Sequence, residues 1–326
     1  MKLGIIGCGL IGTKRARAAA PHPVVAVFDP QRDRAEKLAA ECPGARVANS
    51  MGDLLAAPLD AVVIATTHDQ LAPLAIQALQ AGKHVLVEKP GARSAPELEA
   101  VHAVATRAAR VVRVGFNHRF HPALLKAHEL VRSGVLGPMM YIRGRYGHGG
   151  RIGYDKEWRA VPAISGGGEA IDQGIHLVDL SRWLMGDLGL KASHAPTYFW
   201  DMPVEDNAFM LLTAPGGEAA WLHATWTEWK NLFSLEIYGR VGKVQVDGLG
   251  GSYGPEKLTY YKMLPQLGPP ETTVWEYPGP DESWVREFAD FAAAIDGRAG
   301  VGATLDDAVA ALRIIDQVKR PAGGAT

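Results

Sequence analysis

Residues 3–12 read LGIIGCGLIG, and this stretch decides the fold of the first part of the chain. A short apolar run leads into three glycines spaced Gly-x-Gly-x-x-Gly, and residues 13–20 are rich in helix formers. Residues 24–28 make a second apolar run, which ends at Asp29. This order of strand, glycine turn, helix, strand and acid is the context in which the glycine pattern indicates dinucleotide binding.

Each of the three glycines has a physical role in such a turn. Gly7 permits the tight turn, Gly9 lets the backbone approach a pyrophosphate, and Gly12 lets helix and strand pack closely. Leu10 and Ile11 would open the helix, whose first N–H groups and dipole favour bound phosphates. We therefore predict that these five residues bind the phosphates of a dinucleotide.

The acid after the second strand predicts which dinucleotide is bound. Asp29 lies 17 residues beyond Gly12, where a carboxylate can hydrogen-bond the ribose 2′-hydroxyl. A 2′-phosphate would meet a like charge there, so the sequence favours NAD over NADP. Arg32 lies close enough to soften this preference, and we include it among the predicted cofactor-binding residues.

The alternation of strand and helix continues beyond this first unit. Apolar runs at 61–65, 84–87 and 111–114 alternate with helix-like segments, which predicts a parallel, doubly wound α/β sheet. Ligands collect beyond the carboxyl ends of the strands of such sheets. The residues that follow these runs are predicted to bind the cofactor (Thr66, Thr67, His68, Glu88 and Lys89) or the substrate (Lys89, Asn117 and Arg119).

After about residue 122 the pattern changes. Strand-like runs, among them 139–146, 208–213 and 219–226, are separated by Gly/Pro turns and are not interleaved with helices. This predicts a mostly antiparallel sheet in a second, α+β domain. We therefore predict two domains, 1–121 for the cofactor and 122–326 for the substrate, and the helices near the C-terminal end could pack back on the first domain.

The composition bounds the partners and the compartment. Lys and Arg number 34 against 35 Asp and Glu, so the chain has no basic excess of the kind that binds nucleic acid or a membrane surface. No apolar run approaches the roughly 18 residues of a membrane span, and the first residues do not resemble a signal peptide. We expect a cytoplasmic protein in which Cys8 and Cys42 are reduced thiols.

Lys89 is the first candidate for chemistry. It stands in Glu88-Lys89-Pro90, and a proline biases the residue before it towards an extended backbone, which restricts where Lys89 points. An isolated lysine is usually a solvated surface residue. At the carboxyl end of a strand, however, it becomes a candidate for contact with a ligand.

A second candidate cluster runs from Gly166 to His176. Its three glycines would let a ligand approach the backbone, and Asp172 and His176, four residues apart, would share one face of a helix. A carboxylate at that spacing can orient an imidazole and raise its pKa towards the range of a general acid or base. Either residue could instead be a core or capping residue. A metal would need a third ligand, so we predict no metal site.

Residues 147–159 form a third candidate, a glycine-rich segment with aromatic and basic side chains. Such a mixture suits stacking on a sugar ring together with hydrogen bonds to hydroxyls or a phosphate. It is equally compatible with an ordinary surface loop. The predicted substrate-binding residues in this segment are Tyr154, Trp158 and Arg159.

Four motifs follow one another over nearly the whole chain: Gly7-x-Gly9-x-x-Gly12, Glu88-Lys89-Pro90, Gly115-Phe116-Asn117-x-Arg119-Phe120-x-Pro122 and Gly167-Gly168-x-x-x-Asp172-x-Gly174-x-His176. Together they resemble the glucose–fructose oxidoreductase / inositol dehydrogenase / MocA (Gfo/Idh/MocA) family. The resemblance implies a Rossmann domain followed by a domain with a large open sheet. The outer face of that sheet commonly forms a dimer interface, so we expect a homodimer or homotetramer.

The resemblance also implies hydride transfer between a nicotinamide and a carbinol carbon of a sugar, cyclitol or related polyol. Lys89, Asp172 and His176 match the family's catalytic positions. On that basis His176 would exchange the hydroxyl proton, Lys89 would stabilise negative charge on the same oxygen, and Asp172 would orient its neighbours. The family often has Thr-Pro-x-x-x-His where this chain has Thr67 and Leu71 in place of the proline and histidine, which affects contacts around the nicotinamide ribose.

Three functional interpretations follow. The leading one is an NAD-dependent dehydrogenase or ketoreductase acting on a CH–OH group of a sugar-like alcohol. The second is a glycoside hydrolase that keeps NAD bound, oxidises C3 transiently and eliminates the aglycone, since it would share the same glycine turn. The third is a non-catalytic dinucleotide sensor, which would have no need of Lys89, Asp172 and His176.

Overall fold

The computed structural model describes residues 1–319, which divide into two compact units. Unit 1 joins Met1–Asn117 to Ser283–Ala310, and unit 2 joins His118–Glu282 to the residues from Ala311 onward. The chain therefore passes from unit 1 to unit 2 and returns to unit 1 at Ser283. The sequence-based division at 1–121 and 122–326 stays a prediction.

Unit 1 is built on a six-stranded sheet in the order β3-β2-β1-β4-β5-β6, and all of its neighbouring strands are parallel. The strand order reverses between β1 and β4, which is the switch point where ligands bind in such sheets. The strands are β1 (Leu3–Ile6), β2 (Val24–Phe28), β3 (Arg46–Val47), β4 (Ala61–Ile64), β5 (His84–Glu88) and β6 (Val112–Gly115).

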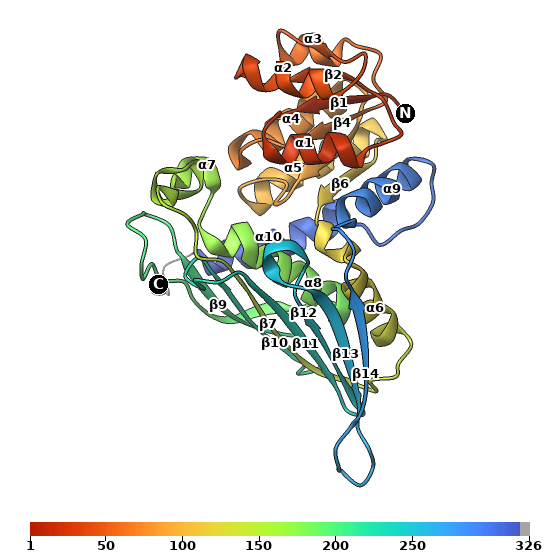
Figure 1. Cartoon of the computed structure of the whole chain (residues 1–326). Coiled ribbons are helices and arrows are strands. Elements are labelled where there is room, and N and C mark those ends of the chain that lie inside the picture. Colours follow the sequence, from red (N-terminus) through yellow and green to blue (C-terminus); the bar gives the residue numbers. More distant parts are fainter. Residues whose placement is uncertain (320–326) are drawn as a thin grey trace. The chain divides into compact units, whose positions relative to one another are not determined.

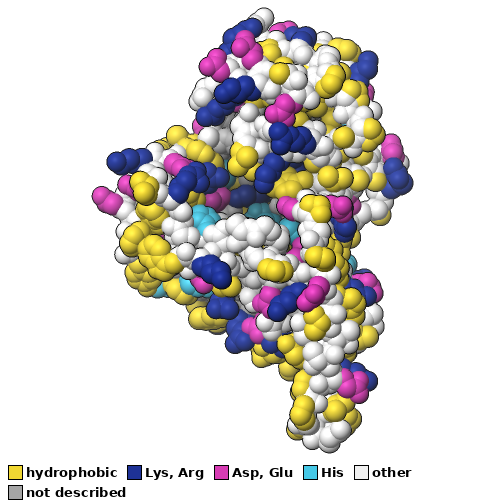
Figure 2. Space-filling model, in the orientation of Figure 1, with side chains coloured by type: hydrophobic (Ala, Val, Ile, Leu, Met, Phe, Trp, Pro, Cys, Tyr) yellow, Lys and Arg dark blue, Asp and Glu magenta, His cyan; other side chains and the backbone are white. Residues whose placement is uncertain are grey.

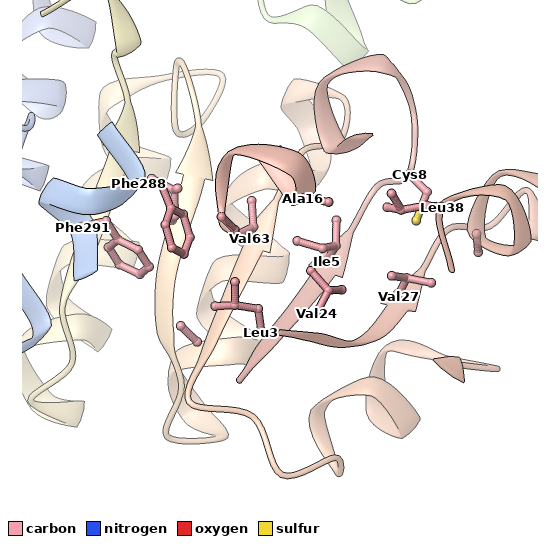
Figure 3. Close-up of a cluster of buried hydrophobic side chains, with 14 residues drawn as sticks. Leu3, Ile5, Cys8, Ala16, Val24, Val27, Leu38, Val63, Phe288 and Phe291 are labelled. Carbon is pink, nitrogen blue, oxygen red and sulfur yellow. The ribbon is translucent and has the colours of Figure 1, made fainter. Parts of the chain in front are cut away.

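Helices connect these strands and cover the sheet (Figure 1). β1 and β4 are buried along their whole length, which explains why their sequences are continuous apolar runs. Phe288 and Phe291 of α9 pack into the same apolar cluster as Leu3 and Val63 of the sheet (Figure 3). The helices of this unit are α1 (Leu10–Ala18), α2 (Arg32–Glu41), α3 (Met51–Leu55), α4 (His68–Gln80), α5 (Ala95–Ala108) and α9 (Ser283–Ile295).

Unit 2 is built on an eight-stranded sheet in the order β14-β13-β12-β11-β7-β10-β9-β8. Only β7 and β10 pair in parallel among these neighbours, so the sheet is mostly antiparallel. The two sheets confirm the predicted fold class. The strands are β7 (Met139–Gly147), β8 (Gly189–His194), β9 (Asn207–Thr213), β10 (Ala219–Thr225), β11 (Leu232–Gly239), β12 (Gly242–Asp247), β13 (Glu256–Lys262) and β14 (Glu271–Tyr277).

Two helices, α6 (Pro122–Arg132) and α8 (Ile175–Met185), cover one face of this sheet (Figure 1). A Cβ atom on Gly144 of β7 would lie 3.2 Å from Leu177 of α8, so the glycine lets the helix approach. At the start of α6 the Ala123 N–H donates to the Glu256 carboxylate of β13 at 2.7 Å. A short helix, α7 (Pro162–Ser165), precedes α8, and α10 (Leu305–Val318) spans the point where the division between the units falls.

The surface carries charges of both signs. Basic and acidic side chains are interspersed on the visible face rather than gathered by sign (Figure 2), in keeping with a formal net charge of −1. Cys8 and Cys42 are free cysteines. Among the helices of residues 1–319, none has the length and apolar character needed to cross a membrane.

Candidate functional site

The glycine turn after β1 has the geometry that a bound pyrophosphate requires. Gly7 has a φ of +87°, and a Cβ atom there would lie 2.3 Å from the Ala65 carbonyl oxygen. A Cβ atom on Gly12 would lie 1.8 Å from the Gly7 carbonyl oxygen. Both positions therefore need glycine because the backbone segments approach too closely for any side chain.

Gly9 differs from the other two glycines. Apart from Gly9 itself, its two chain neighbours and the backbone of its own helix, no heavy atom of residues 1–319 lies within 4 Å of the position that its Cβ atom would take. It is the N-cap of α1 and no side chain caps this helix end, where Leu10 and Ile11 lie in the first turn. The open space beside these N–H groups suits phosphate oxygens, so the residues fit the predicted cofactor.

Asp29 lies at the end of β2 with its carboxylate held by the backbone. The Cys8 N–H of the glycine turn donates to Oδ2 at 2.8 Å, and the Gln31 N–H donates to Oδ1 at 2.8 Å. Each carboxylate oxygen keeps a further lone pair, so the group can still accept hydrogen bonds from ribose hydroxyls.

Arg32 is bound to other partners. Its Nε donates to Glu36 at 2.8 Å and its Nη1 to Asn49 at 3.1 Å. Glu36 pairs with the guanidinium charge that would otherwise be available to bind a 2′-phosphate. This arrangement favours the same cofactor preference as Asp29.

The loop after β4 holds the next predicted cofactor residues. Thr67 occupies the N-cap position of α4 and its hydroxyl donates to Asp69 at 2.6 Å, while Thr66 Oγ1 donates to the Thr67 carbonyl at 3.3 Å. His68 and Leu71 are buried, with Leu71 0% exposed. Position 71, which often holds histidine in the family that the sequence resembles, therefore contributes an apolar core side chain here.

Lys89 follows β5 in a tight turn. The Gly91 N–H donates to the Glu88 carbonyl at 2.9 Å, and the Lys89–Pro90 peptide is cis. Lys89 is partly exposed at the carboxyl end of the parallel sheet. This is the edge at which ligands bind in such sheets, as the sequence predicts for this lysine.

The Glu88 carboxylate, which precedes Lys89, is turned to a buried ion cluster. Arg15 of α1 donates from Nε to Glu88 and from Nη1 to Glu287 of α9, and the Trp284 ring lies 4.4 Å from its guanidinium carbon. Burial, together with the neighbouring Glu88 charge, raises the pKa of Glu287 to about 7. Glu88 therefore contacts a structural arginine, and its predicted role towards the cofactor stays a prediction.

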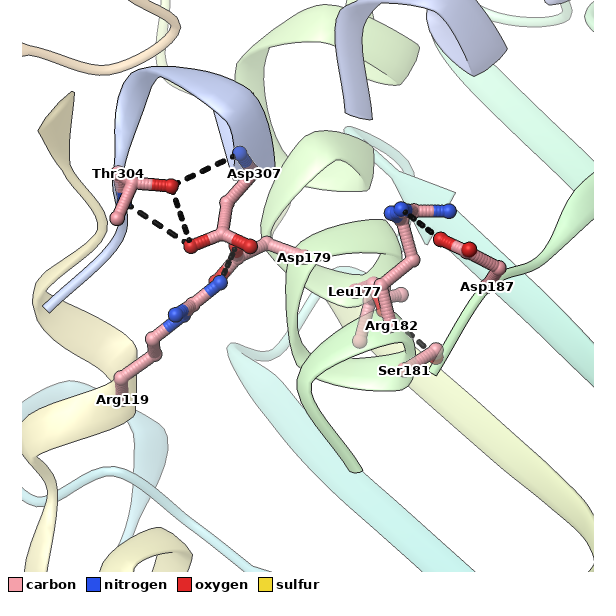
Figure 4. Close-up of polar contacts among 8 residues, drawn as sticks. All are labelled: Arg119, Leu177, Asp179, Ser181, Arg182, Asp187, Thr304 and Asp307. Atoms are coloured by element: carbon pink, nitrogen blue, oxygen red, sulfur yellow. Dashed lines mark hydrogen bonds and ion pairs between the residues drawn. The ribbon is translucent and has the colours of Figure 1, made fainter. Parts of the chain in front are cut away.

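Asn117 and Arg119 both lie in buried polar contacts. The Asn117 side chain donates to the Ser283 hydroxyl at 2.9 Å inside unit 1. In unit 2 Arg119 forms a two-pronged ion pair with Asp179 of α8, at 2.9 and 2.6 Å (Figure 4). These contacts connect segments of the fold. The substrate-binding roles of Asn117 and Arg119 stay predictions.

Asp172 and His176 are carried by a helix with an irregular start. Residues 170–174 form a π-helical turn, and α8 begins only at Ile175. A Cβ atom on Gly168 would lie 2.0 Å from the Glu205 carbonyl oxygen, so a glycine is required where the turn begins. Single π turns are found frequently at functional sites. The sequence predicts a helical segment over 168–183, and the structure forms it with two successive helical geometries.

His176 is buried and stacked on a second imidazole. It is 4% exposed, and its ring lies 3.8 Å from that of His118, with 24° between the planes. His118 also meets the edge of Tyr146 at 5.2 Å. Burial raises the pKa of Tyr146 well above its ordinary value, so its hydroxyl stays protonated.

The predicted residues of the loop 147–159 are brought to Asp172. Arg159 donates from Nε to the Asp172 carboxylate at 3.1 Å and lies 4.5 Å from the Trp158 ring. Tyr154 is 2% exposed and packs edge-on against Trp226 at 5.0 Å, as part of an apolar cluster. Burial and then the Asp172 charge raise the pKa of Tyr154. Unit 2 therefore gathers four of the predicted residues, Tyr154, Trp158, Arg159 and Asp172.

Several residues of these clusters were not predicted from the sequence. His118 lies within a motif that was recognised, and only its stacking on His176 reveals it. Arg15 and Glu287 are 272 positions apart, and no local pattern joins them. Within residues 1–319 no group of three or more His, Cys, Asp and Glu side chains could hold a metal ion.

Two family models match the chain. Residues 1–116 match the model described as an oxidoreductase family with an NAD-binding Rossmann fold, and residues 124–245 match the GFO/IDH/MocA C-terminal domain. The first match confirms the prediction of an NAD-binding domain and agrees with the glycine geometry. The second lies on the sheet and helices of unit 2.

Named relatives and a solved structure agree with these matches. The chain is 32% identical over 226 residues to Inositol 2-dehydrogenase 2 of Saccharopolyspora erythraea, over 67% of this chain and 64% of that protein. It is 30% identical over 235 residues to Levoglucosan dehydrogenase of Pseudarthrobacter phenanthrenivorans, over 67% of this chain and 60% of that protein. The chain thus matches less than two thirds of the length of these two curated relatives.

The solved structure of a levoglucosan dehydrogenase in complex with NADH superposes with a TM-score of 0.87. The sequence identity is 22%, and the match covers 98% of this chain and 95% of that one. At this identity the similarity shows that the two proteins share a fold.

Proposed function

Because this chain belongs to the Gfo/Idh/MocA oxidoreductase family, we propose that it is an NAD-dependent dehydrogenase or ketoreductase acting on a carbinol carbon. The substrate class is a sugar, cyclitol or related polyol, since relatives are named inositol and levoglucosan dehydrogenases. The observation that carries the proposal is His176, a buried imidazole at the start of α8, directly after the π turn that holds Asp172.

The proposed cofactor is NAD rather than NADP. Asp29 is held by two backbone N–H groups in an orientation that leaves lone pairs for ribose hydroxyls, and Arg32 is engaged by Glu36 and Asn49. A 2′-phosphate would meet the Asp29 charge without a free arginine to offset it. The test is the affinity of both cofactors for Asp29→Ala, in which we expect the preference for NAD to be lost.

The proposed chemistry assigns a proton to one residue and a charge to another. When bound, NAD supplies the nicotinamide ring that accepts or donates the hydride. His176 takes the proton of the substrate hydroxyl in oxidation and returns it in reduction. Lys89 hydrogen-bonds the substrate oxygen and stabilises the negative charge that develops on it. Asp172, paired with Arg159, orients the groups around it.

The substitution Lys89→Ala tests this assignment directly. We expect turnover to fall by at least about a hundredfold, the range for acid–base and oxyanion-type groups, while NAD affinity changes little. Lys37→Ala is the matched control, because Lys37 is an exposed lysine on α2. Turnover of Lys89→Ala near that of the control would show that Lys89 has no catalytic role.

The substrate itself is best found with a panel of sugars, inositols, uronic acids and sugar nucleotides. NADH formation at 340 nm on any of these ligands supports the dehydrogenase. Release of an aglycone from a glycoside without net NADH formation would instead indicate the hydrolase that oxidises C3 transiently. If neither NADH nor a released aglycone is formed, the non-catalytic dinucleotide sensor is indicated.

We further propose that the open face of the unit 2 sheet associates with a second copy of the chain. Paired residues on this face stack or form ion pairs, such as Tyr141 on Tyr238 at 4.2 Å and Arg143 with Glu236. Trp221 is nevertheless 52% exposed and Tyr141 40% exposed. Trp221→Glu should dissociate the oligomer in sedimentation velocity, and a wild-type monomer would exclude this proposal.

A further inference from the structure

Two loops of unit 2 present an exposed aromatic pair. Phe199, between β8 and β9, is 56% exposed, and Trp229, between β10 and β11, is 66% exposed. Their rings meet edge to face, with centroids 4.7 Å apart and planes at 89°. Together they leave apolar ring surface open to water on two loops that are distant in the sequence.

The first loop is rigidly held. Asp206 is 0% exposed, and its carboxylate accepts the N–H groups of Tyr198, Phe199 and Trp200 at 2.8, 2.7 and 3.0 Å. Burial raises the pKa of Asp206, but the hydrogen bonds from the Asn207 side chain and from these backbone groups outweigh it. The pKa therefore lies below its ordinary value. A buried carboxylate thus fixes three successive backbone groups, and the ring of Phe199 is presented on a preorganised backbone.

The second loop holds Trp229 in a conformation that a tryptophan rarely adopts. Its φ is +59°, and the Lys230 N–H donates to the Glu228 carbonyl at 2.7 Å across it. Gly149 makes room for this turn, since a Cβ atom there would lie 3.2 Å from the Trp229 Cα. A positive φ at a bulky residue is unfavourable and persists where the surrounding structure imposes it, commonly at ligand-binding positions.

The aromatic pair continues inward through a series of ring contacts. Phe199 meets Trp200 at 5.2 Å, and Trp200 meets Tyr154 at 5.8 Å. Tyr154 lies within the electrostatic reach of Asp172 and Arg159. The exposed rings therefore lie at the outer end of a row of ring contacts whose inner member, Tyr154, interacts with the charge of the candidate catalytic carboxylate.

We propose that Phe199 and Trp229 form a subsite for a second ring of the substrate, attached to the ring that is oxidised. One face of a pyranose consists of C–H bonds, which pack against the negatively polarised face of an aromatic ring. The inference rests on the proposed function and narrows it, since it selects glycosides and disaccharides over free monosaccharides. A second copy of the chain is the alternative occupant of this pair.

Binding is measured without turnover, so that the subsite and the proposed activity can fail separately. The probes are methyl α- and β-glucoside, maltose and cellobiose, titrated by saturation-transfer NMR in the presence of NADH. We expect at least one disaccharide to bind about tenfold more tightly than the methyl glycoside of the same linkage. Phe199→Ala/Trp229→Ala should remove this difference and leave methyl glycoside binding unchanged.

Tyr198→Ala is the matched control. Tyr198 is 65% exposed and its N–H is held by the same Asp206, but its ring lies beside His194 rather than in the pair. Phe199→Leu/Trp229→Leu keeps apolar bulk without ring faces and should behave like the double alanine variant. The proposal is overturned if wild type shows no disaccharide preference, if the preference survives in the double variants, or if these variants change only the sedimentation coefficient.

Discussion

Arg15 in unit 1 and Arg119 in unit 2 are both buried arginines, and each lies beside a tryptophan, Trp284 or Trp183. Their ion pairs with carboxylates differ. Arg119 donates two hydrogen bonds to the carboxylate of Asp179 (Figure 4). Arg15 is shared by two carboxylates, Glu88 and Glu287. At Arg15 one positive charge faces two carboxylates in a buried environment, so one acid is in surplus.

The surplus acid at Arg15 accounts for part of the pKa shift of Glu287. Burial raises the pKa of Glu287 to about 7, and Glu88 and Asp290 add to this, while Arg15 opposes it. Asp290 in turn lies 3.7 Å from Arg113 of β6. Arg15 therefore lowers the pKa of Glu287 without cancelling the opposing effects of burial and of the Glu88 charge. Three tests, in order of decreasing effect, examine this contrast.

The largest difference is expected when one acid is removed from each cluster. Asp179→Asn removes the carboxylate that accepts two hydrogen bonds from the buried Arg119 and should lower the free energy of unfolding by about 3–5 kcal/mol. Glu287→Gln leaves Arg15 paired with Glu88 and should cost less than about 1 kcal/mol at pH 7.5. Urea denaturation of the two variants measures both losses of unfolding free energy. Equal losses would contradict the expectation that Arg15 keeps a carboxylate partner when Glu287 is replaced.

The second test is the dependence of stability on pH. The pKa of Glu287 in the folded state, about 7, exceeds the ordinary value of 4.5, so the folded protein binds more protons between these values. Wild type should therefore lose about 2–3 kcal/mol of stability from this group as pH rises from about 4.5 to 7, and the loss should level off by about pH 8. The difference in unfolding free energy between wild type and Glu287→Gln isolates this contribution. A difference that is constant across the window would refute the raised pKa.

The smallest effect is expected at an exposed pair. Arg17 and Glu41 form an ion pair at 2.8 Å with side chains 68% and 43% exposed. Water already solvates both charges, so Arg17→Met should change the free energy of unfolding by less than about 0.5 kcal/mol. A loss comparable with that of Asp179→Asn would mean that burial does not govern these pairs.

Much of the fold followed from local patterns. Continuous apolar runs predicted β1 and β4 because strands covered on both faces contain little else. The sequence also predicts helices over 282–295 and 305–318, and the structure ends these helices at the same residues, Ile295 and Val318. β13 and β14 were missed, although Thr259-Tyr260-Tyr261 and Thr272-Thr273-Val274-Trp275 are rich in strand-forming residues. Polar residues in β13, of which Glu256 and Thr259 are buried, and the mostly exposed side chains of β14 hide the apolar alternation that usually marks a strand.

The candidate site was predicted unevenly for a similar reason. Gly7 and Gly12 were recognised because each is needed by backbone atoms close in the chain or in the adjoining strand. His118, which stacks on His176, and Glu287, which binds Arg15, act through partners 58 and 272 residues away. No spacing rule connects such pairs.

The sequence by itself determined the glycine turn for the dinucleotide and the order of the apolar segments along the chain. It also determined the identity of the residues that could exchange a proton. These depend on φ preferences and apolar periodicity, which act over a few residues. Only the tertiary structure decided that Arg159 would hold Asp172, that Arg15 would be shared by two acids, and that Phe199 would meet Trp229. Such contacts depend on which segments pack together, and packing brings into reach side chains that no local pattern relates.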